Sequence, residues 1–311
     1  MKQKEKVVVT GGAGFIGSHL IERLVEKGYA VTVLDDLSSG KIENIKSHID
    51  NTVEFVEGSV TDLALLQRHF RGVRYVFYLA AIPGVSQSVV DPLASHEVIL
   101  GGLLNTLIAA RDNKVEKVIY ASSSSVYGDT PTLPKVESMI PNPLSPYAAM
   151  KLAAEHYCRA FYSVYGLKTV SLRYFNVYGP KQGIKYAAVI PMFITAVKDG
   201  KPTIIEGDGE QTRDFTYVKD VVEATVLSAE NDAIGEYNIA RGERVTINEL
   251  AKLIMRLAGK DVEIIHGAPR PGDVRHSLAD ISRAKTFGYN PEYSLEDGLS
   301  ETIRWFNDKQ G

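Results

Sequence analysis

The chain has very few residues that could crosslink it. It contains one cysteine, Cys158, among 311 residues, which excludes an intrachain disulfide and a cysteine-based zinc site. A single thiol is typical of a reducing compartment, so we expect a cytoplasmic protein. Apolar runs are short as well. None approaches the roughly 18 residues of a membrane span, and the three valines after Lys6 are too few for a signal peptide.

An excess of positive charge is also absent, because the formal net charge is −3. Proteins that bind nucleic acids or anionic membranes usually carry a basic surplus, so we expect no nucleic acid and no membrane as partner. Any anionic ligand must then be held by a few well-placed cations. No internal repeat or low-complexity segment interrupts the chain, and we predict no metal site.

Short β-branched runs alternate with longer amphipathic stretches in the first half of the chain. This alternation predicts an α/β fold with a doubly wound, Rossmann-type parallel sheet covered by helices on both faces. The strand runs lack a clean polar–apolar alternation, as expected for strands buried on both sides. We predict strands at residues 6–10, 30–34, 53–56, 75–79, 117–121 and 168–173, and helices at residues 15–28, 63–70, 89–113 and 146–166.

The pattern changes near residue 176, where glycine and proline become frequent and the elements become shorter. We therefore divide the chain into a first domain, 1–175, and a smaller mixed α/β substrate domain, 176–311. The split need not be clean, because residues 218–240 contain a predicted helix and strand that could return to the main sheet. A last amphipathic helix is predicted at residues 295–307.

A glycine-rich turn follows the first predicted strand and opens the first predicted helix. Gly12, Gly14 and Gly17 satisfy G-x-G-x-x-G, and Gly11, Gly14 and Gly17 satisfy G-x-x-G-x-x-G. Such glycines allow a sharp turn, close approach of the backbone to a pyrophosphate and tight packing of helix on strand. The free N–H groups at the helix N-terminus attract phosphates. Ordinary loop chemistry can also give such a turn, so the flanking strand and helix carry the prediction of a dinucleotide site.

An acidic residue stands where the ribose of a dinucleotide would be bound. Asp35 ends the second predicted strand, 18 residues after Gly17, and no arginine follows within residues 36–40. A carboxylate there accepts hydrogen bonds from ribose hydroxyls and repels a 2′-phosphate, so we predict NAD rather than NADP. The alternative for Asp35 is a turn or capping aspartate. Asp62 could meet the adenine edge, or could equally cap the helix that begins at residue 63.

A tyrosine and a lysine, Tyr147 and Lys151, lie four residues apart and so share one face of a helix. About one such spacing is expected by chance, but Pro146 suits the first turn of a helix beside the ligand-binding edge of the sheet. A free tyrosine has a pKa of about 10. We expect the lysine ammonium and a nicotinamide cation to lower this pKa, which would make Tyr147 a base. The alternative is an exposed tyrosine and a solvated lysine.

Four serines, residues 122–125, end the fifth predicted strand. A hydroxyl at this place can donate a hydrogen bond to a substrate oxygen. The alternative is a turn in which the hydroxyls bond their own backbone. Composition alone does not distinguish the four.

Together these segments resemble the extended short-chain dehydrogenase/reductases, and within them the UDP-glucose/UDP-galactose 4-epimerases. The resemblance covers essentially the whole chain, and it is more specific for the superfamily than for the substrate. The matching segments are residues 10–20, 79–81, 121–128, 145–151, 173–180, 186–191, 207–209, 213–215 and 270–274.

The resemblance implies an NAD-dependent enzyme that inverts C4 of a UDP-hexose through a transient 4-keto sugar. Tyr147 is the implied base, Lys151 tunes it and holds the nicotinamide ribose, and Ser123 bonds the sugar oxygen. The implied cofactor contacts are Gly11, Gly14, Phe15, Ile16, Gly17, Asp35, Ser39, Gly40, Asp62, Leu79, Ala80, Ala81, Tyr147 and Lys151, and the implied substrate contacts are Ser123, Tyr147, Asn176, Ala188, Val189, Arg213, Arg270, Asp273 and Ser277.

Several of these positions bear on the substrate. Arg213 and Arg270 resemble diphosphate clamps and Asp273 resembles a uridine ribose acceptor. For each arginine, a solvated surface cation is the alternative. Residues 187–189 resemble epimerases that also accept N-acetylated hexoses, and the small Ser277 leaves room for an N-acetyl group. Interconversion of UDP-GlcNAc and UDP-GalNAc therefore stays open.

Other positions depart from the relatives. Ile99 stands where the family usually has an asparagine, so the polar contact of that asparagine is missing. Residues 83–88 lack the cation that a uronate would require. Ser124 and Ser125 replace the Asp-Glu pair of 4,6-dehydratases, which disfavours dehydration. Two alternatives to the epimerase remain: another nucleotide-sugar modifier, and a non-catalytic NAD-binding sensor.

The resemblance also implies a homodimer. The predicted helices at residues 89–113 and 147–166 resemble those that form the family's four-helix interface. Their apolar faces would equally suit the internal core of one subunit.

Overall fold

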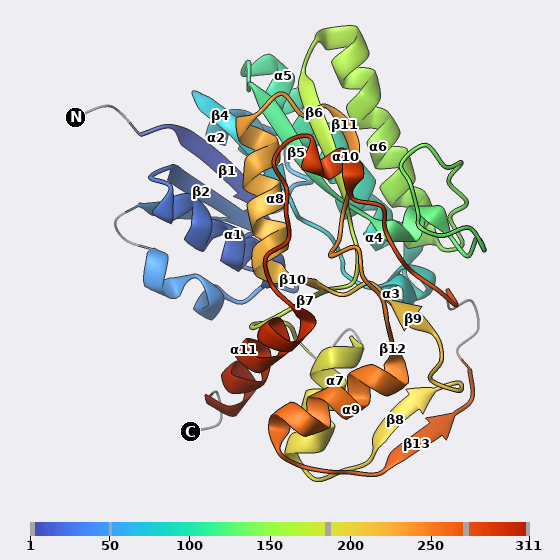
Figure 1. Cartoon of the computed structure of the whole chain (residues 1–311). Coiled ribbons are helices and arrows are strands. Elements are labelled where there is room, and N and C mark those ends of the chain that lie inside the picture. Colours follow the sequence, from blue (N-terminus) through green and yellow to red (C-terminus); the bar gives the residue numbers. More distant parts are fainter. Residues whose placement is uncertain (1–3, 50–51, 184–187, 270–273, 309–311) are drawn as a thin grey trace.

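A seven-stranded parallel sheet forms the centre of the molecule (Figure 1). The computed structural model describes residues 4–49, 52–183, 188–269 and 274–308. The strand order is β3-β2-β1-β4-β5-β6-β11, and every adjacent pair is parallel. The predicted Rossmann-type sheet is confirmed, with the six predicted strands shifted by at most two residues at either end. The strands are β1 (Lys6–Thr10), β2 (Ala30–Asp35), β3 (Val53–Glu57), β4 (Val73–Tyr78), β5 (Lys117–Ser123), β6 (Lys168–Tyr174) and β11 (Gly235–Ile239).

Helices cover both faces of this sheet. On one face, α1 (Phe15–Glu26) and α8 (Val218–Glu230) pack side by side (Figure 1). On the other face lie α2 (Leu63–His69), α5 (Gly102–Asp112) and α6 (Pro146–Tyr165). The strands are apolar on both sides because each side meets a helix layer. Since β11 pairs with β6, the segment from α8 to β11 does return to the main sheet, whereas the domain division at residue 175 stays an interpretation.

The prediction of one continuous helix at residues 89–113 is wrong. The break comes at Asp91-Pro92, because the proline has no N–H to continue the preceding helix. Asp91 then caps a new helix, its Oδ1 accepting the Ala94 N–H at 3.0 Å. The segment consists of α3 (Val85–Val90), α4 (Pro92–His96), the π-helical turn η3 (Glu97–Gly101) and α5.

The stretch from α4 to α5, Pro92–Asp112, is the one helical segment of the described chain that is long and apolar enough for a membrane span. We expected no segment apolar enough for a membrane span, and by length and mean hydropathy this segment is one. About 44% of its apolar window is buried, and α5 packs on α2, α6, β4 and β5. A helix between a sheet and other helices needs the same apolar composition, which explains the stretch without a membrane.

Most of the remaining elements gather at the end of the molecule where α7, α9 and β13 lie (Figure 1). Three two-stranded ladders, β7–β10, β8–β13 and β9–β12, connect them. The apolar core on the α1 side of the sheet continues into this region through Phe193, Leu250 and Leu299. These elements are β7 (Val177–Tyr178), α7 (Val189–Lys198), β8 (Thr203–Glu206), β9 (Thr212–Arg213), β10 (Thr216–Tyr217), β12 (Val245–Thr246), α9 (Ile247–Ala258), β13 (Ile264–Gly267) and the predicted last helix α11 (Leu295–Asp308). The short helix α10 (Ser282–Lys285) lies apart from them, beside β11 of the main sheet (Figure 1).

Three short 3-10 turns complete the described chain. Two of them, η1 (Ile42–Asn44) and η2 (Lys46–His48), lie between β2 and β3. The third, η4 (Ser124–Tyr127), follows β5 directly and contains two of the four serines.

Candidate active site

The glycine-rich turn lies where the sheet order reverses, since β2 and β3 continue from β1 on one side and β4 on the other. Ligands of doubly wound sheets bind at such a switch point. Gly11 has a φ of +70°, and a Cβ on it would lie 2.8 Å from the Ala80 backbone nitrogen. A Cβ on Gly17 would lie 2.3 Å from the Gly11 carbonyl oxygen. Only glycine fits these two positions, and the backbone is left open to a phosphate.

The N-terminus of α1 is suited to an anion. Gly14 is its N-cap, no side chain of the described residues caps it, and its first turn has no acidic residue. The N–H groups around Phe15 and Ile16 therefore point out of the helix end. A pyrophosphate is the ligand that such a terminus accepts best.

Asp35, at the end of β2, lies next to this turn. Its two carboxylate oxygens accept the N–H groups of Ala13 and Leu37, each at 2.9 Å. Burial raises the pKa of Asp35, and the two backbone hydrogen bonds oppose that rise. Each oxygen keeps a further lone pair, so the carboxylate fits ribose hydroxyls as well as the turn that it caps. Both interpretations of Asp35 are thus compatible with the structure.

The other predicted cofactor residues surround the same edge. A Cβ on Gly40 would lie 3.0 Å from Asp35 Oδ1, so the Ser39-Gly40 segment passes close to that carboxylate. Asp62 caps α2, its Oδ1 accepting the Leu65 N–H at 3.0 Å, which is the structural alternative predicted for it. Leu79, Ala80 and Ala81 directly follow β4, on the far side of the switch point.

Tyr147 and Lys151 lie on one face of α6, as predicted. The helix begins at Pro146, and the Ser145 hydroxyl caps it by accepting the Ala148 N–H at 3.2 Å. Lys151 Nζ lies 5.6 Å from the centroid of the Tyr147 ring. It also donates a hydrogen bond of 2.6 Å to the Ala121 carbonyl oxygen of β5. The pair is therefore a partly buried contact and not a solvated lysine beside an exposed tyrosine.

The electrostatics of this pair differ from the expectation. Burial raises the pKa of Tyr147, opposed by a hydrogen bond with the Ser123 hydroxyl. Burial lowers the pKa of Lys151 to about 7, opposed by the charge of Glu155. The lysine ammonium lies over the Tyr147 ring and bonds a carbonyl oxygen, so it does not offset the desolvation of the phenolate. In the protein alone the Tyr147 pKa is thus raised and not lowered, and the lowering expected with a bound nicotinamide cation stays a prediction.

The structure separates the four serines that composition could not. The Ser122 hydroxyl points into the core and donates to the Glu155 carboxylate. Ser123 contacts Tyr147, and its Oγ also accepts the Ser125 N–H at 3.2 Å. Ser123 therefore has both the turn role and the position next to Tyr147 that a substrate contact requires.

Two residues next to the pair were missed by sequence reasoning. Ser88 of α3 is fully buried and its Oγ accepts the Tyr147 backbone N–H at 3.0 Å. Glu155 lies one helical turn beyond Lys151 and forms a buried ion pair with Arg173, with Nη2 to Oε2 at 2.7 Å. The i, i+4 spacing from Lys151 to Glu155 was a readable signal, whereas nothing in the sequence distinguished Ser88 from its neighbours.

The predicted substrate residues lie at the loops beyond the sheet. Asn176 has a φ of +34°, and its Nδ2 donates to the Asp214 carbonyl oxygen at 3.1 Å. Arg213 Nη1 donates to the Thr212 carbonyl oxygen at 3.0 Å. The same oxygen accepts the N–H of Ser277, so the structure brings Arg213 and Ser277 together.

The Asp214 side chain holds three loops together. Its Oδ1 accepts the Arg241 N–H, and its Oδ2 accepts those of Gly242 and Ala279, all at 3.1 Å. The carboxylate is fully buried. The loops that contain Arg213 and Ser277 therefore share one attachment point.

The remaining predictions for the substrate side have mixed outcomes. Ala188 and Val189 form the start of α7, which has no side-chain cap from the described residues and no acidic residue in its first turn. Arg270 and Asp273 lie outside the described residues. Ile99 is fully buried in η3, where it packs as a core residue.

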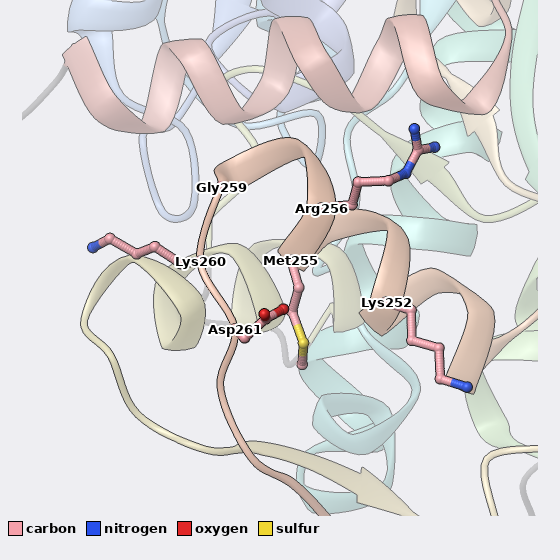
Figure 2. Close-up of a pocket in the computed structure, with 6 residues that line it drawn as sticks. All are labelled: Lys252, Met255, Arg256, Gly259, Lys260 and Asp261. Atoms are coloured by element: carbon pink, nitrogen blue, oxygen red, sulfur yellow. The ribbon is translucent and has the colours of Figure 1, made fainter.

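A surface hollow on α9 does not belong to this site (Figure 2). The side chains of Lys252, Arg256 and Lys260 point away from one another in Figure 2. Arg256 pairs with Glu296 at 2.9 Å, and Lys260 Nζ donates to a backbone carbonyl oxygen at 2.8 Å. These cations do not converge on one point, so the hollow is not suited to a phosphate.

Comparison with known proteins identifies the family. A family model described as GDP-mannose 4,6 dehydratase matches residues 8–302. The chain belongs to this family. The UDP-glucose 4-epimerase of Mycolicibacterium smegmatis is 39% identical over 311 residues, covering 98% of this chain and 99% of that protein.

Solved structures agree with this assignment. The UDP-N-acetylglucosamine 4-epimerase of Methanobrevibacter ruminantium, in complex with UDP-N-acetylmuramic acid, is 43% identical with a TM-score of 0.96, covering 99% of each chain. The UDP-glucose 4-epimerase of Thermus thermophilus, in complex with NAD, is 39% identical with a TM-score of 0.90, covering 97% of this chain and 99% of that one. The relatives also include a uronate decarboxylase and a uronate epimerase. The chain is an NAD-dependent member of this UDP-sugar epimerase and dehydratase family.

The Ser88 contact generates a first prediction. Ser88→Ala should lower turnover on a UDP-sugar about tenfold, because it removes the acceptor that fixes the Tyr147 backbone. The KM for the sugar should change little. The matched control is Ser95→Ala, since Ser95 is equally buried. Each hydroxyl donates to a nearby backbone carbonyl oxygen, Ser88 to that of Val85 and Ser95 to that of Asp91, but only Ser88 bonds the Tyr147 backbone. Steady-state kinetics of both variants check this, and equal losses in the two would refute it.

The Lys151 pKa generates a second prediction. Below pH 7 both folded and unfolded chains carry the ammonium, so its burial penalty is fully present. Between pH 7 and about 10.4 the unfolded chain binds more protons, so stability rises with pH. Lys151→Met should therefore raise the free energy of unfolding by about 1–3 kcal/mol at pH 7, and the gain should vanish near pH 10.

Urea unfolding at both pH values measures this difference. The control is Lys252→Met, which removes an exposed lysine of α9 and should change little. A Lys151→Met protein less stable than the original at pH 7 would contradict the prediction.

Proposed function

We propose that this protein inverts C4 of a UDP-hexose, with NAD as its cofactor. The observation that carries the proposal is the meeting of Tyr147, Lys151 and Ser123 at the carboxyl edge of the sheet, beside a turn shaped for a dinucleotide. A phenol, a buried ammonium and a hydroxyl are the groups required to move a proton at a sugar hydroxyl.

NAD⁺, when bound, supplies a hydride acceptor and a positive charge. Asp35, Gly11 and the N-terminus of α1 would hold it. In the proposed reaction the Tyr147 oxygen takes the proton of the C4 hydroxyl and later returns it. Ser123 donates a hydrogen bond to the same sugar oxygen. Burial keeps the Tyr147 pKa high in the protein alone, so Tyr147 can act as this base only after it has released its own proton to solvent, a step that further positive charge nearby would favour.

The substrate end of the proposal rests on residues near Asp214 and on the start of α7. Asn176 offers an amide, Arg213 offers a guanidinium, and α7 offers an N-terminus that no described side chain caps, all of which suit a diphosphate. Ser277 is a small side chain next to Arg213, which leaves space for an N-acetyl group. We therefore include UDP-GlcNAc and UDP-GalNAc with UDP-glucose and UDP-galactose as proposed substrates.

A substrate panel combined with one variant tests this function. Incubation with each of the four UDP-sugars, followed by proton NMR of the anomeric signals, should show C4 inversion of at least one pair. Tyr147→Phe should lower that turnover by about 10³-fold or more, because the proton acceptor is lost. Its affinity for NAD and UDP should be retained. If no sugar is inverted even with added NAD, the substrate assignment fails.

We further propose that the protein works as a homodimer through α3, α4 and α6. Exposed apolar side chains concentrate there, with Val90 79%, Leu93 76% and Val164 71% exposed. A patch of this kind is typical of an interface between subunits. Leu93→Glu should convert a dimer to a monomer in sedimentation experiments. Ile204→Glu is the control, since Ile204 is similarly exposed, at 61%, but lies on β8; a monomeric unmutated protein would rule out the interface.

A further inference from the structure

Lys151 is enclosed by two aromatic rings. Its Nζ lies 4.9 Å from the ring centroid of Tyr120 and 5.6 Å from that of Tyr147. Both distances are within the range of about 6 Å in which an ammonium is attracted to the face of a ring. Lys151 is only 4% exposed and Tyr120 is fully buried, so water competes little with this contact.

The hydroxyl of Tyr120 does not account for the presence of this residue. It is buried and has no hydrogen-bond partner among the described residues. A buried unpaired hydroxyl costs free energy, so phenylalanine would suit a purely structural role as well or better. Tyr120 does offer the face of its ring. It also directly precedes Ala121, whose carbonyl group accepts the hydrogen bond from Lys151. Two consecutive residues of β5 thus contact the same ammonium.

Few charged groups act on this ammonium. Tyr120 faces it from β5, and Tyr147 and Glu155 lie on its own helix, α6. Arg173 of β6 forms a two-point ion pair with Glu155, with Nε to Oε1 at 3.0 Å and Nη2 to Oε2 at 2.7 Å. Because that pairing offsets the Glu155 charge, the electron-rich face of Tyr120 becomes a significant stabiliser of the ammonium.

We propose that Tyr120 is a positioning residue whose ring face holds Lys151 as an ammonium between the end of β5 and the Tyr147 ring. The ring contact is independent of the substrate, whereas its catalytic consequence rests on the proposed function. Loss of the ring face should leave Lys151 in the same burial with one attraction fewer. The ammonium should then release its proton at a lower pH.

A titration of Lys151 in the protein without ligand tests the contact directly. Protein labelled with ¹³Cε-lysine is titrated by NMR, and the Lys151 signal is assigned by its loss in Lys151→Met. Tyr120→Phe keeps the ring and should leave the midpoint unchanged. Tyr120→Leu should lower the midpoint by about one pH unit, as expected for one cation–π contact at a buried site.

The sign of the shift separates this role from a packing role. A smaller side chain that merely admits water would relieve the burial of Lys151 and raise the midpoint. Tyr78→Leu is the matched control, because Tyr78 is also fully buried, its ring centroid lies 6.0 Å from that of Tyr120, and it belongs to β4. It should leave the midpoint in place. An unchanged or raised midpoint in Tyr120→Leu would overturn the proposal.

A second variant covers the possibility that Tyr120→Leu does not fold. A trifluorinated phenylalanine at position 120 keeps the shape of the ring and weakens its negative face. It should lower the Lys151 midpoint relative to Tyr120→Phe, and identical midpoints would refute the ring contact.

The catalytic consequence is measured separately. The alkaline limb of the pH profile of kcat should move down by the same amount in Tyr120→Leu, and not in Tyr120→Phe. If the unmutated protein inverts none of the four UDP-sugars, the proposed function fails and the NMR titration still decides the ring contact. If it inverts a sugar and the alkaline limb of Tyr120→Leu does not move, only the catalytic role of Tyr120 fails.

Discussion

The burial of one lysine ammonium is the constraint on which the candidate site depends. Lys151 must lie within hydrogen-bonding distance of the Ala121 carbonyl group, so α6 has to pack closely on the end of β5. An unpaired charge in this place would be very costly, and the fold surrounds it with a carbonyl oxygen, two ring faces and a carboxylate. The position of Tyr147, four residues earlier on α6, follows from the same packing.

A buried polar network supports this arrangement from behind. Glu155 accepts hydrogen bonds from the Ser122 hydroxyl and from Nε and Nη2 of Arg173, and Arg173 Nη1 donates to the Tyr127 hydroxyl at 2.9 Å. Tyr127 in turn donates to Asn238 of β11 at 2.7 Å. Removing one member would leave a buried charge or hydroxyl without its partner, so such networks hold one geometry. The network connects β5, α6, β6, η4 and β11 immediately behind Ser123.

Much of the fold could be predicted because its signals are local. The alternation of strands and helices, the glycine turn and the Tyr147–Lys151 spacing each come from a short segment, and the structure has all three. One local signal was readable but outweighed, since Asp91-Pro92 breaks a helix that the apolar pattern continued. Another was readable and not used: Thr246 with Glu249 forms the capping box of α9, a helix that we did not predict from the sequence.

The rest depends on burial and on contacts between distant segments. Ser88 reaches the Tyr147 backbone across 59 residues, and no local pattern distinguishes it from the serine two positions earlier. The direction of the Tyr147 pKa also could not be read from the sequence. The nearby lysine argued for a decrease, but the desolvation that decides the sign is a property of the packed site. Asp62 shows the same ambiguity, because a helix cap and a ligand contact use the same side chain.

The carboxylate of Asp214 fixes several loops on the predicted substrate side of the molecule relative to one another. Its two oxygens join the loop of Asp214 itself to the loop at Arg241-Gly242 and to the segment at Ala279, so these three parts of the chain keep their mutual spacing. Ser277 lies two residues before Ala279, and its own backbone N–H bonds the Thr212 carbonyl oxygen, so backbone contacts hold this buried residue in place. A change of side chain at position 277 would therefore remove none of the N–H groups that Asp214 accepts.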